Sequence, residues 1–282
     1  MNTKKIARWN VRTAVISGAA SGIGQAAIKA LVADGSNVVA IDLKIPAATL
    51  EEFTILKTRQ DQKIITLEAD VTNAEGLREA VSSAVMEIGE PDFALNCAGI
   101  QRAGNFERIS DADYAAVINV NLLGSRNFAR AVLPHMHAAS QLALLASMGG
   151  LIGNYGYSAY AASKFGVVGL AEVLRLEYKP LDIGVSVICP PEIPTAMVEE
   201  EMKTMHPVAR QLKDSGGLVQ LEELIPYMLN ESILKKKYMV IPGRQARILR
   251  VALKLIPTGI LNMYTDSVVR KVFKREPGAP KR

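Results

Sequence analysis

The sequence predicts an α/β fold in which one doubly wound parallel sheet carries helices on both faces. Short runs rich in β-branched and apolar residues alternate along the chain with longer segments of helical spacing. The runs are apolar throughout rather than at every second position, which is typical of parallel strands covered on both sides. A glycine-rich turn follows the first run, at a place where such sheets bind ligands.

Six segments are expected to form the strands of this sheet. They are residues 13–17, 37–41, 63–67, 93–96, 142–147 and 184–189. The first helix, at 25–33, is ended by Asp34-Gly35, and long helices are expected near 111–138 and 157–179. No repeat or linker divides the first 190 residues, so a single domain is expected over residues 1–234, with an irregular segment at about 190–217.

Composition excludes several classes of protein. Of the 282 residues, 49% are hydrophobic and 22% are charged, which excludes a largely disordered chain. Two cysteines, Cys97 and Cys189, are too few for a disulfide scaffold and fit a reducing compartment. There is neither a secretory signal nor an apolar stretch of about 18 residues, so a cytoplasmic protein is expected. His135 and His137 face different directions on a helix, and no metal is expected.

Residues 235–282 are expected to form a basic helical extension. They contain 13 lysines and arginines against two acidic residues. Basic residues recur every three or four positions between 244 and 254, among apolar ones, which predicts an amphipathic helix ended by Pro257. Such a helix can lie on an anionic membrane surface. The alternatives are that it covers the ligand site, packs on a neighbouring subunit or stays solvated; sparse aromatic residues argue against nucleic acid.

The glycine-rich turn reads Gly18-Ala-Ala-Ser-Gly22-Ile-Gly24 and joins the first strand to the first helix. Glycines let the backbone turn sharply and approach a pyrophosphate, while the helix N-terminus offers free N–H groups and a partial positive charge. The spacing differs from the commoner G-x-G-x-x-G pattern. Its position directly after the first strand nevertheless favours a dinucleotide site over an ordinary turn.

Asp42 ends the second strand, where a carboxylate can accept hydrogen bonds from a ribose diol. No lysine or arginine lies in the glycine turn to receive a 2′-phosphate, which favours NAD(H) as the cofactor. Lys44 is close enough to leave NADP(H) open. The alternative role of Asp42 is that of a helix or turn cap.

Tyr160 and Lys164 are four residues apart on a predicted helix, so the hydroxyl and the ammonium can share a face. For Tyr160 to act as a general acid or base near neutral pH, its pKa must fall by about 3 units from ~10. One ammonium at about 4 Å supplies an effect of this size at an effective dielectric constant of ~20. Tyr155 and Tyr157 have no such lysine, and Ser147 ends the fifth strand, where its hydroxyl can hold a substrate oxygen.

Together these features resemble the short-chain dehydrogenase/reductase family over about residues 11–197. The matching segments are the glycine turn, Asp70-Val71-Thr72, Asn96-Cys97-Ala98-Gly99, Asn121, Ser147 and Tyr160 with Lys164. The resemblance implies a Rossmann-type fold and an NAD(P)-dependent oxidoreductase that acts on an alcohol or carbonyl group. Family members usually pair through the two long helices, which implies a homodimer or homotetramer.

The resemblance also assigns roles to single residues. Tyr160 would be the acid/base, and Ser147 would orient the carbonyl or alcohol. Lys164 would lower the tyrosine pKa and bind the nicotinamide ribose, while Asn121 would hold a water in a proton relay. The residues implied to contact or support the cofactor are Gly18, Ser21, Gly22, Ile23, Gly24, Asp42, Asp70, Val71, Asn96, Ala98, Gly99, Tyr160, Lys164, Pro190, Ile193 and Thr195.

Three positions depart from the family pattern. Ser17 stands where the family usually has threonine, which keeps a hydroxyl. Cys97 replaces the second asparagine of the usual pair and is interpreted as a small buried hydrophobe. Pro191 replaces the usual glycine in the segment from Cys189 to Thr195, and the added prolines fix φ and remove donors. By the resemblance, the Ile193 backbone and the Thr195 hydroxyl would meet the nicotinamide carboxamide.

The substrate class is suggested by a patchy resemblance to the 3-ketosphinganine reductase branch, in the double proline, residues 199–201 and residues 264–275. We therefore expect an apolar ketone or secondary alcohol with a long, lipid-like chain. Met197, Met202 and Met205 would line its site or pack in the core. The alternatives are a 3-oxoacyl thioester reductase, a steroid-type hydroxy dehydrogenase and a non-catalytic dinucleotide-binding scaffold.

Overall fold

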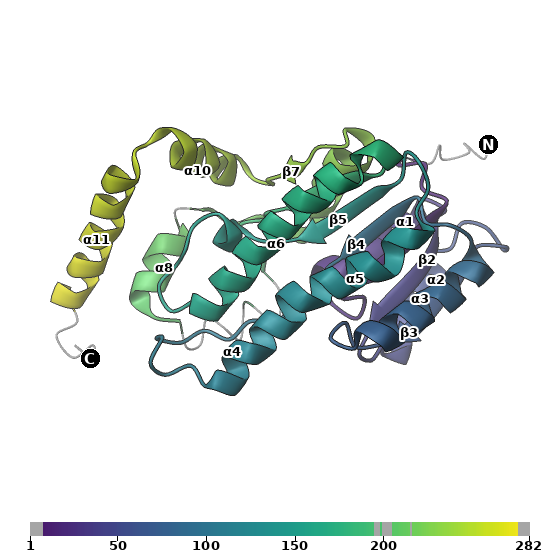
Figure 1. Cartoon of the computed structure of the whole chain (residues 1–282), viewed down its shortest axis with the longest axis horizontal. Coiled ribbons are helices and arrows are strands. Elements are labelled where there is room, and N and C mark those ends of the chain that lie inside the picture. The colour runs from purple at the N-terminus through teal and green to yellow at the C-terminus, as the bar shows by residue number, and fades with distance from the viewer. Residues whose placement is uncertain (1–7, 195–197, 199–204, 215, 276–282) are drawn as a thin grey trace.

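The computed structural model describes residues 8–194, 198, 205–214 and 216–275. Within this part of the chain, seven parallel strands form one sheet in the order β3-β2-β1-β4-β5-β6-β7. The strands are β1 (Thr13–Ser17), β2 (Asn37–Asp42), β3 (Ile64–Glu68), β4 (Phe93–Asn96), β5 (Gln141–Leu145), β6 (Gly184–Ile188) and β7 (Met239–Val240). Figure 1 shows helices in front of this sheet and behind it, which confirms the predicted doubly wound α/β fold.

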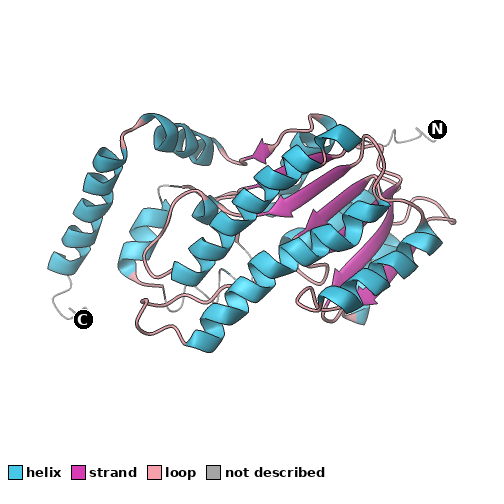
Figure 2. Cartoon of the chain, viewed as in Figure 1, coloured by secondary structure: helices cyan, strands magenta, loops and turns pink. Residues whose placement is uncertain are grey.

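The helices follow the strands as expected for parallel connections. They are α1 (Gly22–Ala33), α2 (Ala47–Ile55), α3 (Ala74–Ile88), α4 (Asp111–Ile118), α5 (Gly124–Val132), α6 (Ser158–Glu177), α8 (Pro207–Asp214), α9 (Leu221–Leu229), α10 (Arg244–Leu255) and α11 (Thr258–Arg275). The long helix predicted near 111–138 is α4 and α5 joined by a π-helical turn at Asn119–Leu123. Figure 2 shows helices covering the strands, with α10 and α11 to one side of the sheet.

Two apolar cores lie on opposite faces of the sheet because successive side chains of a strand point to opposite sides. Val15 of β1 packs in the core formed with α3, α5 and α6. Its neighbours Ala14 and Ile16 pack in the core formed with α1, α2 and α9. This double burial explains why the strands are apolar throughout.

All six predicted strands are present, with small shifts at their ends, whereas β7 was not predicted. β7 has two residues and pairs with β6, and such a short segment shows no periodicity in the sequence. The basic segment from residue 235 onward therefore adds one strand to the sheet before it forms α10 and α11. Ser147 lies just beyond β5, at the N-cap of a 3₁₀ turn over Met148–Gly150.

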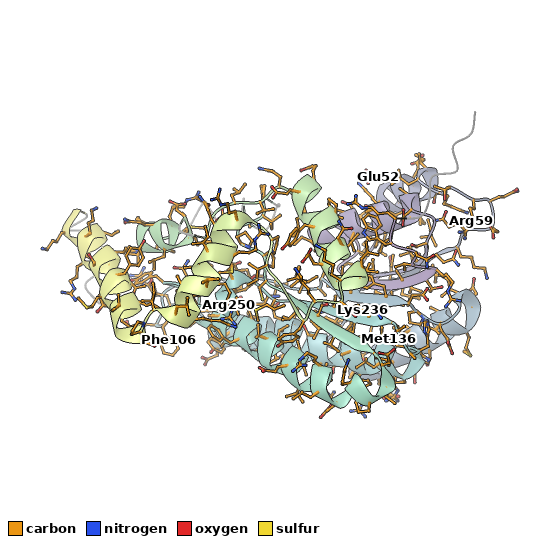
Figure 3. All side chains as sticks on the ribbon, turned by 90° about the horizontal axis from the view of Figure 1, so that it is seen from above. Glu52, Arg59, Phe106, Met136, Lys236 and Arg250 are labelled. Atoms are coloured by element: carbon orange, nitrogen blue, oxygen red, sulfur yellow. The ribbon has the colours of Figure 1, made fainter. Side chains whose placement is uncertain are left out.

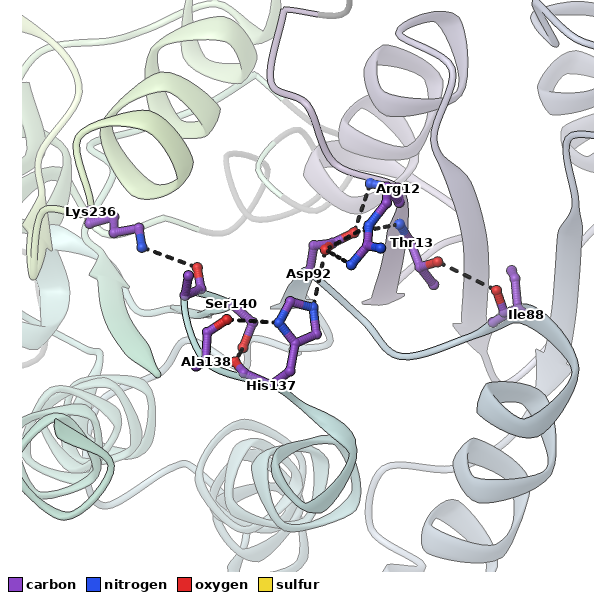
Figure 4. A network of polar contacts seen from close by, with 9 residues as sticks. Arg12, Thr13, Ile88, Asp92, His137, Ala138, Ser140 and Lys236 are labelled. Atoms are coloured by element: carbon purple, nitrogen blue, oxygen red, sulfur yellow. Dashed lines mark hydrogen bonds and ion pairs between the residues drawn. The ribbon is translucent and has the colours of Figure 1, made fainter. Parts of the chain in front are cut away.

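At the amino ends of the strands, Asp92 joins three segments of the chain. Its carboxylate accepts hydrogen bonds from the backbone N–H groups of Arg12, at 2.8 Å, and Thr13, at 3.0 Å. The Arg12 guanidinium lies 2.9 Å from the same carboxylate, and His137 Nε2 lies 3.1 Å away. Figure 4 shows this network, which ties the start of β1 to the loop before β5. His137 therefore has a structural partner within this network.

The helices α10 and α11 lie at one end of the molecule, far from the end that carries Glu52 and Arg59 (Figures 1 and 3). α11 packs against α8, and Phe273 of α11 meets the rings of Tyr155 and His206 at centroid distances of 6.4 and 5.7 Å. Among the described residues, no helix has the length and apolarity that crossing a membrane requires. The extension is thus folded onto the body of the protein.

Candidate active site

The parallel register brings the carboxyl ends of the strands to one edge of the sheet, where the site lies. Ser17 at the end of β1 is level with Ile41 of β2 and with Asn96 of β4. The chain leaves β1 and β4 toward opposite faces, which makes this edge the switch point where doubly wound sheets bind ligands. A cavity of about 650 Å³ opens there.

The glycine turn forms a tight cradle at this edge. Gly18 has φ +70°, and a Cβ built on it would lie 2.8 Å from the backbone nitrogen of Ala98. A Cβ on Gly24 would lie 2.1 Å from the carbonyl oxygen of Gly18. Since α1 begins at Gly22, its free N–H groups face the same cavity. A bare backbone at a helix N-terminus fits the pyrophosphate of a dinucleotide, as the sequence predicts.

Asp42 lies at the end of β2 and lines the cavity. Its two carboxylate oxygens accept hydrogen bonds from the backbone N–H groups of Ala20, at 2.9 Å, and Leu43, at 2.8 Å. Asp42 therefore caps the glycine turn, which was the alternative interpretation. Each carboxylate oxygen has a second lone pair, so the cap does not prevent a ribose hydroxyl from also donating to it.

Further predicted cofactor residues line the same cavity or support it. The lining includes Ser21, Ile23, Asp70, Val71, Ala98, Gly99, Pro190 and Ile193. Asn96 is buried below them, accepts from Ser17 Oγ and donates to Ser125 Oγ at 2.9 Å, so it joins β1, β4 and α5. Thr195, Met197, Met202 and residues 199–201 lie outside the described residues.

Asn121 belongs to the π-helical turn between α4 and α5 and is fully buried. Its side chain donates to the Ile100 carbonyl at 2.9 Å and to Ser163 Oγ at 3.0 Å, and it accepts from the Ile100 N–H at 2.8 Å. These bonds fix the segment after β4 against α6. Its proton-relay role remains a prediction.

Ser147, Tyr160 and Lys164 converge on the cavity, as their spacing predicts. The Ser147 hydroxyl is hydrogen-bonded to Tyr160 and accepts from the Gly149 N–H at 3.1 Å. The Lys164 ammonium donates to the Leu145 carbonyl at 2.9 Å and lies 5.7 Å from the centroid of the Tyr160 ring. A hydroxyl pair beside a buried cation can bind a carbonyl oxygen and exchange a proton with it.

The expected effect of Lys164 on the tyrosine is corrected by the structure. Burial raises the pKa of Tyr160, and the hydrogen bond to Ser147 and the positive charge of Lys213 offset this rise only in part. Burial also lowers the pKa of Lys164 to about 8. The helical spacing predicts the attraction of an ammonium but not the cost of burying the phenolate, and burial is the largest effect on the pKa of Tyr160 in the structure.

Cys97 lines the cavity beside these residues, and burial raises its pKa to about 12. A thiol with so high a pKa is a poor nucleophile. The structure therefore agrees with its interpretation as a small apolar residue rather than a redox group.

Sequence reasoning missed the outer wall of the cavity. Five of its residues come from α10 and α11, namely Leu249, Leu253, Leu261, Tyr264 and Thr265. α8 adds Leu212 and Lys213. The amphipathic pattern of residues 244–256 indicated an apolar face, and covering the site was one of the roles left open for it.

Comparisons with known proteins identify the family. The family profile described as short chain dehydrogenase matches residues 12–206. This chain belongs to the short-chain dehydrogenase/reductase family. It is therefore an NAD(P)-dependent oxidoreductase of the kind that interconverts CH–OH and C=O groups, and the predicted enzyme class is confirmed.

The relatives include reductases with different named substrates. A 3-dehydrosphinganine reductase from Danio rerio is 30% identical over 224 residues, 78% of this chain and 68% of the relative. A 3-oxoacyl-[acyl-carrier-protein] reductase from Thermotoga maritima is 33% identical over 195 residues, 68% of this chain and 78% of the relative.

Solved structures share the fold of this chain. The carveol dehydrogenase of Mycobacterium avium in complex with NAD has a TM-score of 0.73 at 24% identity, covering 84% of this chain and 98% of its own. A levodione reductase has a TM-score of 0.72 at 26% identity and covers 84% and 97%.

Proposed function

We propose that this short-chain dehydrogenase/reductase transfers hydride between a nicotinamide cofactor and an apolar ketone or secondary alcohol with a long chain. The observation that carries the proposal is the continuity of the cavity. It runs from Ser147 and Tyr160 to an apolar wall made by Leu249, Leu253 and Leu261. A small polar substrate would leave this wall in contact with water, whereas each methylene buried there contributes about 0.8 kcal/mol.

In the proposed reaction, Ser147 and Tyr160 hold the carbonyl oxygen by their hydroxyl groups. The nicotinamide, when bound, supplies the hydride in reduction or accepts it in oxidation. Tyr160 donates its proton to the oxygen during reduction and takes a proton back during oxidation. Lys164 lines the cavity next to Gly99. It would bind the nicotinamide ribose and provide a positive charge beside Tyr160.

Two named relatives support two substrates within this class. The sphinganine-type relative acts on a long-chain ketone by its name, and the 3-oxoacyl relative acts on a ketone in an acyl chain. The sphingoid ketone is the substrate we favour, because the apolar wall belongs to α10 and α11, outside the segment shared with the family as a whole. The intact set of Ser147, Tyr160 and Lys164 argues against a non-catalytic scaffold.

We propose NAD(H) as the preferred cofactor. The Asp42 carboxylate faces the position expected of the adenosine ribose, where it would accept from the hydroxyls and repel a 2′-phosphate. Both of its oxygens are fixed by backbone N–H groups, so it cannot turn away without breaking the glycine turn. The fixed position of the Asp42 carboxylate supports a preference for NAD(H) over NADP(H).

The outer face of α10 supports peripheral binding to an anionic membrane, from which a lipid-like substrate would enter. Ile248, Val251 and Leu255 are 60, 54 and 76% exposed, while Leu249 and Leu253 of the same helix face the cavity. The exposed basic residues Arg244, Arg247 and Lys254 complement anionic headgroups. The same helix would thus contact both the membrane and the substrate of a cytoplasmic enzyme.

A homodimer or homotetramer is proposed on the basis of exposed apolar residues along α6 and the turn before α5. Phe165, Val173 and Leu176 of α6 are 46, 51 and 59% exposed, and Leu123 is 47% exposed. Long helices with such residues bury them efficiently against a second copy. Sedimentation or light scattering measures this directly.

The experiment that tests the proposed function follows NADH and NADPH absorbance with a panel of ketones. The panel contains 3-ketosphinganine, 3-oxoacyl thioesters of increasing chain length and a steroid ketone. The proposal expects turnover that rises with the length of the alkyl chain. Equal turnover with short and long chains, or turnover confined to the steroid, would contradict it.

A further inference from the structure

Glu192 is a nearly buried carboxylate in the segment that follows β6. Its side chain is 7% exposed and lies 3.3 Å from the Arg210 guanidinium and 3.2 Å from the Lys213 ammonium. Both cations belong to α8, the helix that covers the cavity. The Glu192 carbonyl also accepts from the Val219 N–H at 3.0 Å. Glu192 therefore fixes α8 and the chain after it to the end of the sheet.

Lys213 is placed by this ion pair at the catalytic end of the cavity. Its side chain is 19% exposed, and its ammonium lies 5.4 Å from the centroid of the Tyr157 ring. The rings of Tyr157 and Tyr160 are 6.4 Å apart in an edge-to-face arrangement. Lys213, Tyr157 and Tyr160 all line the same cavity. A cation from α8 thus shares the cavity with the tyrosine that the proposed reaction uses, and it contacts the ring of the neighbouring Tyr157.

We propose that Lys213 is a positioning residue for Tyr160: anchored by Glu192, it adds a second positive charge to the catalytic end of the cavity. Lys164 supplies the first charge from α6, the helix that carries Tyr160 itself. Lys213 supplies the second from α8, which lies within the segment of residues 190–217 that was expected to be irregular. The inference rests on the proposed acid/base role of Tyr160.

Electrostatics set the direction of the effect. Besides burial, the groups that shift the pKa of Tyr160 are Ser147 after β5, Cys189 after β6 and Lys213 on α8. The Lys164 ammonium of α6 lies 5.7 Å from the ring centroid. The Ser147 hydrogen bond and the Lys213 charge lower the pKa of Tyr160, whereas burial and Cys189 raise it. Glu192 pairs with both Lys213 and Arg210, and Arg210 also pairs with Asp214 at 3.0 Å. Despite this pairing, the Lys213 charge lowers the pKa of Tyr160. Removing the ammonium raises the pKa of Tyr160 further.

The test compares Lys213→Met with Lys213→Arg and Arg210→Met in the full-length protein. Methionine keeps much of the apolar stem without the charge, arginine keeps the charge, and Arg210→Met removes the other cation that pairs with Glu192. The measurement is kcat/KM for alcohol oxidation against pH. Lys213→Met should move the midpoint upward by on the order of one pH unit, the scale of one nearby charge. Lys213→Arg should keep the wild-type midpoint, and Arg210→Met should shift it by less than Lys213→Met does.

A wild-type pH midpoint in Lys213→Met would overturn the inference. An equal shift of the midpoint in Arg210→Met would also overturn it, because the effect would then come from the fixing of α8 by Glu192 and not from the charge of Lys213. A readout without substrate separates this inference from the proposed function. Tyrosinate absorbance is titrated in each variant and in the same variant with Tyr160→Phe, and the difference reports Tyr160. An upward shift in Lys213→Met supports the inference even when no tested ketone is turned over, and an unchanged titration refutes it.

Discussion

The Lys164 ammonium lies 5.7 Å from the centroid of the Tyr160 ring and donates its hydrogen bond to the carbonyl of Leu145. This geometry places the cation beside the ring of Tyr160 and ties it to the end of β5. The hydroxyl of Tyr160 is hydrogen-bonded instead to Ser147, the other group expected to hold the substrate oxygen. Binding and proton transfer thus involve the two hydroxyls, while the lysine acts as a fixed charge nearby.

Cofactor preference should depend on Asp42. Asp42→Ala removes a charged acceptor for the ribose hydroxyls, which costs about 1.5–3 kcal/mol, or roughly ten- to a hundred-fold in kcat/KM for NADH. It also removes the repulsion of a 2′-phosphate, so the ratio of NADH to NADPH should fall. Steady-state kinetics with both cofactors measure this ratio. A preference for NADPH in the wild type, or an unchanged ratio in the variant, would show that Asp42 serves only as the cap of the glycine turn.

Chain-length selectivity should depend on the inward face of α10. Leu253→Ala removes apolar surface from the cavity wall, so kcat/KM for long-chain ketones should fall roughly three- to ten-fold. Short ketones that do not reach the wall should be unaffected. The matched control is Val251→Ala, a change of an exposed residue on the same helix. A uniform loss across all chain lengths would indicate that Leu253 stabilises the fold rather than contacts the substrate.

Membrane binding should depend on the exposed basic residues of α10. The double substitution of Arg247 and Lys254 by Glu reverses the charge of the outer face of α10. It should abolish co-sedimentation with anionic vesicles. Each basic residue near such a surface contributes about 1 kcal/mol. Binding by the wild type should be reversed by salt and absent on neutral vesicles.

The control for this prediction changes two exposed basic residues elsewhere, Arg108 and Lys179, to Glu, with the same change in net charge. It should retain vesicle binding. Negligible binding by the wild-type protein would restrict α10 to its role as the cavity wall.

The Asp92 network predicts a pH-dependent contribution to stability. Although burial alone would raise the pKa of Asp92, its bonds to Arg12 and Thr13 lower it below the ordinary value. A depressed carboxylate pKa stabilises the fold above the pKa of the unfolded state, and this stabilisation is lost as pH falls through the folded pKa. Asp92→Asn should therefore lower the free energy of unfolding by about 1–3 kcal/mol near neutral pH. The difference should begin to shrink near pH 4 and should disappear only below the lowered pKa of folded Asp92, as measured by denaturant titration. A difference that stays constant with pH would point to packing instead.

The sequence was sufficient for those parts of the site that local spacing determines. The glycine turn, Asp42 and the Tyr160–Lys164 pair each follow from one strand end or one helix face, so their convergence required only a parallel sheet. Glu192, Lys213 and Leu253 could not be placed in this way. They meet the site through packing of an irregular segment and of two terminal helices. The amphipathic pattern of α10 indicates an apolar face, but apolar residues lie both on its inward side and on its exposed side, so the pattern does not say which of them reach the site.

The pKa of Tyr160 was the other quantity that spacing could not provide. A distance between two charges can be estimated from a helix, but the burial of a phenol depends on α8, β6 and the helices that close the cavity. The direction of the shift therefore required the three-dimensional structure.

The central claim is that Tyr160 transfers the proton, and Tyr160→Phe tests it most directly. The change removes the hydroxyl and keeps the ring, so turnover of the best ketone should fall by ~10²-fold or more. NADH binding, followed by fluorescence, should be retained, and the matched control Tyr155→Phe should keep wild-type turnover. Near-wild-type turnover in Tyr160→Phe with cofactor bound would contradict the account.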